Sequence, residues 1–399
     1  MDWLAETLLS SEERPIVETA ERVARERIAP RAAETDAKGE FPHADFDDLR
    51  QYGLHLMRVP KEYGGLGLSP LAYTLVLAAV AGASASTGLA LNMHTGQCFV
   101  FDFLATVEQK RRYLPRITAG ALLSSAGSDP SSSFTRASVF KIATLAKPVD
   151  GGYVISGRKH YVSLADACQY FHTWVVLDDY ADYKQAVRIA VVPRDHPRLR
   201  IERTWNTLSM RGTASHSLHF DECFIPAEDL VGGPGEAFLP GGPTSSASWE
   251  LGYAAVYFGI AEACYEWSCQ FAGETRYDPD PDPISYDPGV QQHIAHMSIA
   301  LDSARLALYH ACAVRAAGLE ASRGDMETHV AKYLTTEAAV AVTDHAMRMM
   351  GGRGILKRFP LERFFRDART GVVQPPSSER IVDMVGKLRL GVEARGIVA

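Results

Sequence analysis

Histidine pairs are the first candidates for chemistry in this sequence, because imidazole both binds metals and transfers protons. His216 and His219 are three residues apart in an expected strand, so they point to opposite faces. His293 and His296 share one face of an expected helix, but no carboxylate or cysteine motif accompanies them. A zinc site needs three or four converging ligands, so the sequence predicts no metal centre.

The sequence offers little support for a serine nucleophile or a nucleotide-binding loop. No GxSxG elbow occurs, and the serine-rich run SDPSSSF, residues 128–134, lacks an obvious histidine partner. The glycines of GGRG, Gly351 to Gly354, form neither GxGxxG nor a Walker loop, and no strand–helix alternation surrounds them. They indicate a helix end or a close backbone approach instead.

Two adjacent prolines, Pro375 and Pro376, interrupt the stretch GVVQPPSSERIV that follows the charged, helix-like run LERFFRDART. Each proline lacks a backbone donor and fixes its own φ angle, so neither a helix nor a central strand can pass through the pair. The sequence therefore predicts a rigid turn soon after Arg369.

Three regions that differ in their predicted secondary structure must position these residues. Residues 1–121 have helical periodicity, with a first helix expected from a cap near Ser11 to Pro30. Residues 122–236 contain short β-branched runs such as YVISG and VRIAVVPR. Residues 237–399 return to helices, with a narrow apolar seam typical of a bundle. The seam residues are Val290, Ile294, Met297, Leu301, Ala304, Leu308 and Ala311. The pattern predicts an α+β multidomain protein.

Composition limits the partners. The chain has 399 residues, 46% hydrophobic, with 41 Lys plus Arg against 48 Asp plus Glu. No basic block stands out, which argues against nucleic acid as a partner. The N-terminus lacks a signal-peptide pattern, and no apolar run reaches the ~18–20 residues that span a bilayer. The six cysteines show no CxxC spacing, as expected for reduced thiols in the cytoplasm.

Six segments, taken together and in this order, resemble the acyl-CoA dehydrogenase family across nearly the whole chain. They are VPKEYGGLGL (59–68), EQKRRYLP (108–115), GGYVISGRK (151–159), LSMRGTASHSLHFDECFIP (208–226), MMGGRGI (349–355) and FPLERFFRDAR (359–369). The resemblance implies N-terminal helices, a central β-barrel and a C-terminal four-helix bundle. It also implies FAD, an acyl thioester substrate carried by CoA or a carrier protein, and a homotetramer or homodimer.

The resemblance assigns a flavin-ring site to the central region. A segment like SDPSSSF lies against the flavin, which here implies Ser128 and Ser133. HYVS resembles the segment that places an aromatic ring and a hydroxyl beside the flavin, which implies Tyr161 and Ser163. Without the resemblance, these residues would be interpreted as a packed strand with a buried serine.

The nucleotide end of the cofactor is implied to come from a neighbouring subunit. Gly352 and Ser377 fit that place, and Arg276 could pair with the diphosphate. The sequence departs from the family here, because acidic residues follow in RYDPDPDP and Arg348 replaces the usual glutamine. We therefore expect FAD to bind in a site whose adenine-binding end differs from that of the family.

The usual catalytic base is missing. In the family a glutamate shortly after RDAR removes the α-proton, and the matching position here is Pro375. A minority of members place the base on the first helix of the bundle, where this chain has Trp249 followed by Glu250. One residue rotates a helical side chain by about 100°. Glu250 is thus either a relocated base or a carboxylate that stabilises the N-terminus of a helix.

Two kinds of activity follow from these positions. The favoured one is a flavin oxygenase that uses O2, with His94 and Gln374 as polar groups near the substrate. The alternative is an acyl-CoA dehydrogenase that uses Glu250 as its base. An electron-transfer flavoprotein or a flavin reductase would exchange electrons with the cofactor. A flavin-binding paralogue without activity is the third and weakest interpretation.

Overall fold

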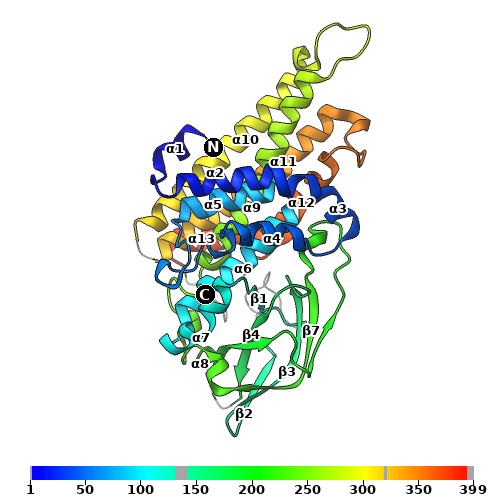
Figure 1. The fold of residues 1–399 in the computed structure, drawn as a ribbon. Helices are drawn as coiled ribbons and strands as arrows, with labels where there is room; N and C mark the ends of the chain where they lie inside the picture. The colour runs from blue at the N-terminus through cyan, green and yellow to red at the C-terminus, as the bar shows by residue number, and fades with distance from the viewer. Residues whose placement is uncertain (1, 131–141, 179, 181, 319–320, 393–399) are drawn as a thin grey trace.

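The computed structural model describes residues 2–130, 142–178, 180, 182–318 and 321–392. Figure 1 shows a sheet at one end of the molecule and long helices at the other, with α6 between them. The N-terminal helices lie against the side of the long helices. This is the three-part arrangement that the sequence predicts.

The N-terminal part is helical. Its α-helices are α1 (Trp3–Leu8), α2 (Arg14–Val23), α3 (Ala32–Lys38), α4 (His43–Gln51), α5 (Pro70–Ala83), α6 (Ala85–Leu104) and α7 (Val107–Thr118). Thr106 begins α7 with a capping box: its hydroxyl accepts from the backbone of Gln109, whose side chain accepts from the backbone of Thr106. The capping box thereby satisfies two backbone N–H groups that the helix itself leaves without a partner.

The helix expected from near Ser11 to Pro30 is α2, and it differs from the prediction at both ends. Glu13, not Ser11, precedes its first residue. Pro30 does not end the helical path, because α2 continues as a π-helical turn over Ala24–Ile28 and a 3₁₀ turn over Ala29–Arg31. Pro30 lies in the first turn of that 3₁₀ segment, where a missing N–H costs no hydrogen bond.

The central part is one eight-stranded sheet in the order β6-β7-β3-β2-β4-β5-β8, with β1 paired parallel to β4. The strands are β1 (Leu123–Ala126), β2 (Leu145–Val149), β3 (Gly152–Val162), β4 (Tyr170–Leu177), β5 (Val187–Pro193), β6 (Leu199–Glu202), β7 (His216–Pro226) and β8 (Leu230–Val231). The short helix α8 (Tyr183–Ala186) precedes β5. The β-branched runs thus form strands as predicted.

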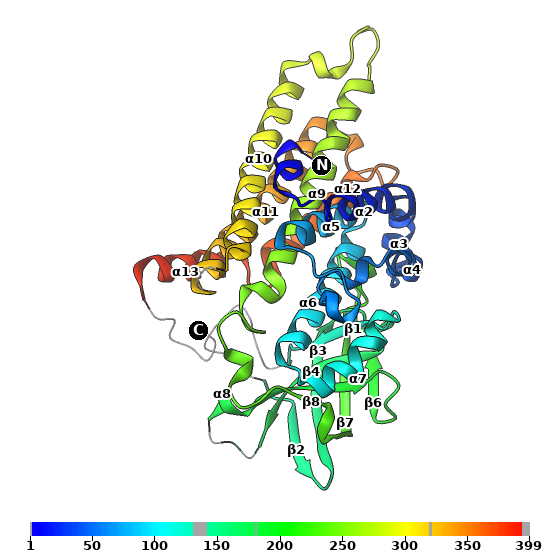
Figure 2. The ribbon, with the colours of Figure 1, turned by 60° about the vertical axis from the view of Figure 1, so that its left-hand side comes forward.

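The C-terminal part is a helical bundle. Its helices are α9 (Ser246–Glu274), α10 (Pro288–Ala316), α11 (Ala321–Met350), α12 (Leu361–Val373) and α13 (Ser378–Leu390). Figure 2 shows α13 at the side of the long helices. Five of the seven predicted seam residues of α10, from Met297 to Ala311, are buried, which confirms the predicted face.

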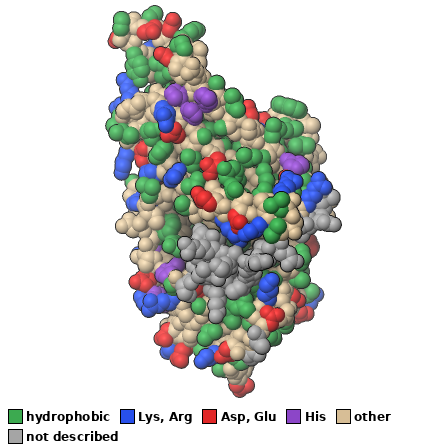
Figure 3. Space-filling view, turned by 180° about the vertical axis from the view of Figure 1, so that it is seen from behind, with side chains coloured by type: hydrophobic (Ala, Val, Ile, Leu, Met, Phe, Trp, Pro, Cys, Tyr) green, Lys and Arg blue, Asp and Glu red, His purple; other side chains and the backbone are tan. Residues whose placement is uncertain are grey.

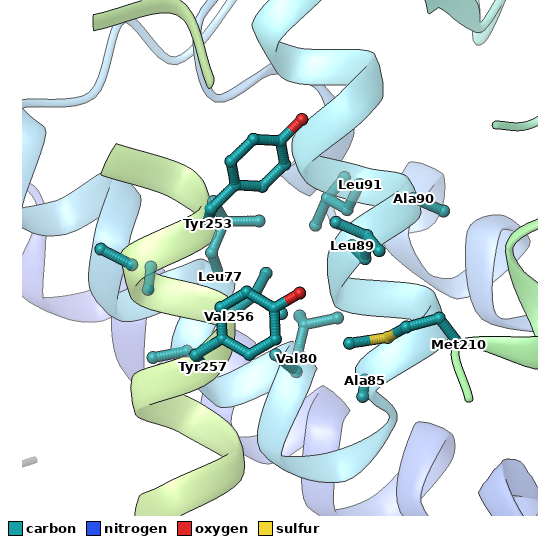
Figure 4. Packing of buried hydrophobic residues seen from close by; sticks show 14 of the residues in the cluster. Leu77, Val80, Ala85, Leu89, Ala90, Leu91, Met210, Tyr253, Val256 and Tyr257 are labelled. Carbon is teal, nitrogen blue, oxygen red and sulfur yellow. The ribbon is translucent and has the colours of Figure 1, made fainter. Parts of the chain in front are cut away.

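The core extends from the N-terminal helices into the bundle. Tyr253 and Tyr257 project from α9 toward α6, where Leu89 and Leu91 lie (Figure 4). Both tyrosines are buried, as is Met210, one of several residues of the sheet part in this cluster. The three parts therefore share one apolar core, which fixes the sheet and the helical bundle relative to each other.

The surface mixes charges of both signs. Lys and Arg side chains are interspersed with Asp and Glu over the described part of the face in Figure 3. In the described part of the chain, no helix combines the length and apolarity needed to cross a membrane.

Candidate functional site

The residues predicted beside the flavin ring come from neighbouring strands. The backbone N–H of His160 donates to the carbonyl oxygen of Ser128 at 2.8 Å, which forms a bridge between the segment after β1 and β3. Tyr161 follows His160 directly. The structure thus brings Ser128, Tyr161 and Ser163 to one end of β1 and β3, whereas Ser133 lies outside the described residues.

Tyr161 is presented to the outside by an irregularity in β3. The register between β3 and β7 shifts between Lys159 and Val162, and Tyr161 adopts a φ of +56°. A positive φ is strained for a tyrosine and persists only where its surroundings enforce it. The side chain is 71% exposed and lies edge-on to Trp205, with ring centroids 6.3 Å apart. An exposed aromatic pair of this kind suits a planar ligand.

Ser163 begins a chain of hydroxyl groups that leads out of the sheet. Its Oγ lies 2.8 Å from Oγ of Ser215, which lies 2.8 Å from Oγ1 of Thr213. The Thr213 hydroxyl donates to the carbonyl oxygen of Met210. The backbone N–H of Met210 in turn donates to Asp367 of α12 at 2.8 Å. The predicted flavin-ring serine is therefore connected to the helix that ends at the proline turn.

A buried ion pair fixes the backbone next to Ser128. Lys159 Nζ lies 2.7 Å from Oδ2 of Asp129, and both side chains are buried. Thr144 donates to Oδ1 of Asp129 through its backbone N–H and its hydroxyl. Burial lowers the pKa of Lys159 to about 8, although Asp129 opposes that shift. Breaking such a buried pair is costly, so Ser128 is held firmly in place.

The residues predicted for the nucleotide end lie elsewhere. Arg276 belongs to the connection between α9 and α10, and Arg353 lies 4.6 Å from the ring of Tyr277 in the same connection, next to Gly352. Figure 1 shows this connection at the end of the bundle opposite the sheet. Arg348 forms an exposed ion pair with Asp344 at 2.7 Å. Within one chain these residues do not approach Tyr161.

Ser377 has a structural role in this chain. Its Oγ accepts from the backbone N–H of Arg380 and caps the N-terminus of α13. Its role toward a cofactor remains a prediction.

The proline turn is tightly held by α9 and α11. Tyr257 donates to Oε1 of Gln374 at 2.5 Å. Lys332 Nζ donates to the carbonyl oxygens of Gly371, Gln374 and Pro376 at 2.9, 3.2 and 2.7 Å. Lys332 is fully buried, and burial lowers its pKa to about 8. One ammonium group thus caps the C-terminus of α12 and fixes the turn that contains Pro375, the position at which the resemblance places the base.

Glu250 points into the bundle toward α11. Its Oε2 lies 2.6 Å from Nδ1 of His329, and both side chains are buried. Burial alone would lower the pKa of His329, but the Glu250 carboxylate outweighs burial and raises it. His329 and Lys332 are three residues apart and share one face of α11. Glu250 therefore belongs to the same charged cluster that holds the proline turn.

His94 is packed inside the protein. Its Nδ1 accepts from the backbone N–H of Leu123 at 3.0 Å, and its ring stacks on His55 with centroids 6.3 Å apart. Burial lowers the pKa of His94 to about 3, so the imidazole is neutral. This geometry anchors α6 to β1; contact of His94 with a substrate stays a prediction.

The histidines considered for a metal contact other side chains. His219 pairs with Glu202, and His216 pairs with Asp166. His293 Nδ1 lies 3.0 Å from Nδ1 of His345. Among the described residues, no group of three or more histidine, cysteine, aspartate or glutamate side chains is arranged to hold a metal ion.

The sequence did not reveal His329, Lys332 or Tyr257. Lys332 and His329 resemble ordinary polar positions of an amphipathic helix. Their spacing of three on one face of α11 was the available signal, but the partner of His329 is 79 residues away. The partners of Lys332 lie 39 to 44 residues away.

The residues at the sheet end fit a flavin ring in their chemistry. Tyr161 and Trp205 supply an exposed aromatic wall, and the hydroxyl of Ser163 can still exchange one hydrogen bond beyond Ser215. At the far end, Arg276 donates to the carbonyl oxygen of Glu274 and Arg348 pairs with Asp344. The described residues predicted for the ring end are therefore free to contact a planar ligand, whereas the arginines predicted for the nucleotide end would have to exchange partners.

Three family models match the chain in order: the N-terminal domain of acyl-CoA dehydrogenase over residues 10–121, the middle domain over 125–223 and the C-terminal domain over 251–380. Putative acyl-CoA dehydrogenase YdbM of Bacillus subtilis is 30% identical over 88% of this chain and 90% of its own length.

Solved structures share the fold. Butyryl-CoA dehydrogenase from Megasphaera elsdenii has a TM-score of 0.87 at 20% identity, covering 98% of this chain and 100% of that one. FMN-bound TdsC from Paenibacillus sp. A11-2 has a TM-score of 0.84 at 25% identity, covering 94% and 97%. From the family models and the curated relative, the chain belongs to the acyl-CoA dehydrogenase family and is a flavin-dependent oxidoreductase.

Proposed function

We propose that this chain binds FAD and an acyl thioester, and that its favoured reaction uses O2 and places one oxygen atom in the product. The observation that carries the proposal is the turn Gln374–Pro376, which offers no carboxylate and is locked by Lys332. Glu250, the alternative base, is engaged with His329 at 2.6 Å. Loss of a general base typically costs about 10²–10⁴-fold in a proton abstraction, without affecting the fold.

FAD would supply two-electron redox chemistry when bound. The chain's own residues would hold its ring, with Tyr161 and Trp205 as the wall and Ser163 and Ser128 as polar contacts. The similarity to TdsC, whose structures are described as FMN-bound and as a dibenzothiophene monooxygenase, is compatible with an O2-using reaction on this fold.

A second candidate is an α,β-dehydrogenase that uses Glu250 as its base. The buried contact between Glu250 and His329 supports it, because it fixes the Glu250 carboxyl group close to Lys332, which binds the carbonyl oxygen of Gln374. Several similar proteins are acyl-CoA dehydrogenases, including the short-chain specific mitochondrial enzyme of Sus scrofa. An electron-transfer flavoprotein would then take the electrons.

One experiment separates the two candidates. The FAD-loaded protein is incubated with acyl-CoA esters of several chain lengths, and in parallel with the same acyl groups on an acyl carrier protein, under ¹⁸O2 with a flavin reductase and NADH. Oxygen-18 in the acyl product supports the oxygenase. Anaerobic bleaching of the flavin with formation of an enoyl product, lost in Glu250→Gln, establishes the dehydrogenase and contradicts the oxygenase.

We also propose a homodimer or homotetramer in the cytoplasm. Arg276 and Gly352 lie at the opposite end of the bundle from Tyr161, so a second subunit would have to bring them to the same cofactor. The six cysteines are free, as a reducing compartment requires. Sedimentation velocity with and without FAD tests the assembly; a monomer that binds FAD fully would contradict it.

A further inference from the structure

A buried thioester carbonyl needs a hydrogen-bond donor, because an acceptor that leaves water without a new partner costs free energy. The proline turn cannot supply one from its backbone. Pro375 and Pro376 have no N–H, and the backbone N–H of Gln374 donates to the carbonyl oxygen of Thr370 at 2.9 Å. A donor at this turn must therefore come from a side chain.

The side-chain amide of Gln374 has two N–H groups, and its orientation is fixed by Tyr257. Tyr257 is fully buried, and burial raises its pKa, so its hydroxyl keeps its proton and donates it to Oε1 of Gln374. That bond fixes which end of the amide carries oxygen. The amide nitrogen Nε2 has two N–H groups, and within the described part of the chain neither has a partner.

The backbone beneath this amide is fixed as well. Lys332 binds three carbonyl oxygens of the segment 371–376. A Cβ atom on Gly371 would lie 3.0 Å from the ring of Tyr257, so α12 approaches α9 as closely as glycine allows. Side chain and backbone of Gln374 are thus held by two different helices, and a donor that is held in advance loses little entropy on binding.

We propose that Nε2 of Gln374 donates a hydrogen bond to the carbonyl oxygen of the bound acyl thioester, and that Tyr257 and Lys332 act as positioning residues for it. The inference rests on the proposed acyl thioester substrate and holds for either reaction. It gives Gln374 a binding role in the position that would otherwise carry a backbone donor and a carboxylate.

The test compares ligands that differ in one carbonyl group. Acetyl-, butyryl- and octanoyl-CoA and the S-ethyl, S-butyl and S-octyl thioethers of CoA are titrated calorimetrically into the dithionite-reduced, FAD-loaded protein without O2, so that no turnover occurs. We expect the wild type to prefer its best thioester over the matched thioether about five- to tenfold, the worth of one net hydrogen bond. Gln374→Met should abolish the preference, and Tyr257→Phe should reduce it.

Gln292→Met, on the exposed face of α10, is the matched control and should keep the preference. Gln374→Met is compared only when its FAD content and thermal unfolding match the wild type, and Tyr257→Phe provides the second readout. A preference that survives in both variants overturns the role of Gln374 and leaves the thioester substrate standing. A wild type that takes up FAD but binds no thioester better than free CoA overturns the substrate proposal and this inference with it.

Discussion

Glu250 is the base in the proposed dehydrogenase reaction, and in the fold its carboxyl group contacts His329 at 2.6 Å. Because the fold raises the pKa of His329, the folded chain holds a proton on the imidazole at pH values where the unfolded chain has lost it. The pair thus contributes stability that is fully present below about pH 6.5, the ordinary pKa of histidine, and is lost as pH rises through the folded value.

Glu250→Gln removes this dependence. We expect the free energy of unfolding at pH 6 to fall by about 1–3 kcal/mol, because a buried charge-assisted bond becomes a neutral one. The decline in stability of the wild type from pH 6 to 7.5 should flatten in the variant. Urea unfolding followed by circular dichroism measures both, and Glu266→Gln on the exposed face of α9 is the control. An unchanged pH profile would show that the pair is not charged.

Sequence patterns identified most of the helices and strands, but not the long-range contacts of the candidate site. The strand VRIAVVPR and the seam of α10 are local patterns, and both occur as predicted. The strained φ of Tyr161 depends on a shift of register between β3 and β7, which no short segment encodes. Likewise, Lys332 has three donors in any helix, but only the folded chain brings three carbonyl oxygens to it.

At the scale of elements, α12 and the proline turn are wedged between α9 and α11. A Cβ on Gly371 would lie 2.7 Å from Cγ2 of Thr336 on α11 and 3.0 Å from Tyr257 on α9. No side chain fits there without displacing a neighbour, so the glycine sets how closely three helices meet.

Gly371→Ala should therefore destabilise the protein although alanine favours helices. We expect a net loss of about 1–2 kcal/mol, since overpacking outweighs the gain of up to about 1 kcal/mol in helix propensity. Gly386→Ala in α13, where nothing lies within 4 Å of the added carbon, should be neutral or stabilising. Differential scanning calorimetry compares the two; equal effects would contradict the wedge.

Lys332→Met gives a second prediction at this scale. A lysine whose folded pKa is lowered to about 8 binds fewer protons when folded than when unfolded, so wild-type stability should rise as pH increases from 8 to 10.5. The variant should lose this rise, and should also lose about 2–4 kcal/mol at pH 7.5 as three carbonyl oxygens lose their donor. Guanidinium unfolding at pH 7.5, 8.5 and 9.5 tests both parts. A rise with pH that persists in the variant would assign it to another group.

At the scale of the whole molecule, one arginine joins all three parts. Arg366 of α12 binds both carboxylate oxygens of Asp36 in α3, at 3.0 and 2.6 Å, and donates to the carbonyl oxygen of Leu208 before β7. Its planar, bidentate geometry fixes the relative position of the N-terminal helices, the sheet and the bundle.

Arg366→Met should loosen this junction. We expect a loss of about 2–4 kcal/mol and unfolding that is less cooperative, because Asp36 is left without its bidentate partner. Calorimetric and van't Hoff enthalpies of unfolding should agree in the wild type and diverge in the variant. Lys357→Met, at an exposed site between α11 and α12, should change neither. A variant that unfolds in a single transition of wild-type stability would contradict this role.

The cluster of Glu250, His329 and Lys332 also restricts how the bundle can assemble. Sliding α11 along α9 by one helical turn, about 5.4 Å, would set an ammonium group against apolar side chains and leave a carboxylate without a proton donor. Apolar helices alone tolerate such slippage far better. This polar cluster, through which Lys332 also holds the proline turn, thus favours one alignment of the helices. Replacing all three residues by apolar ones would stabilise the packing but make the alignment less specific.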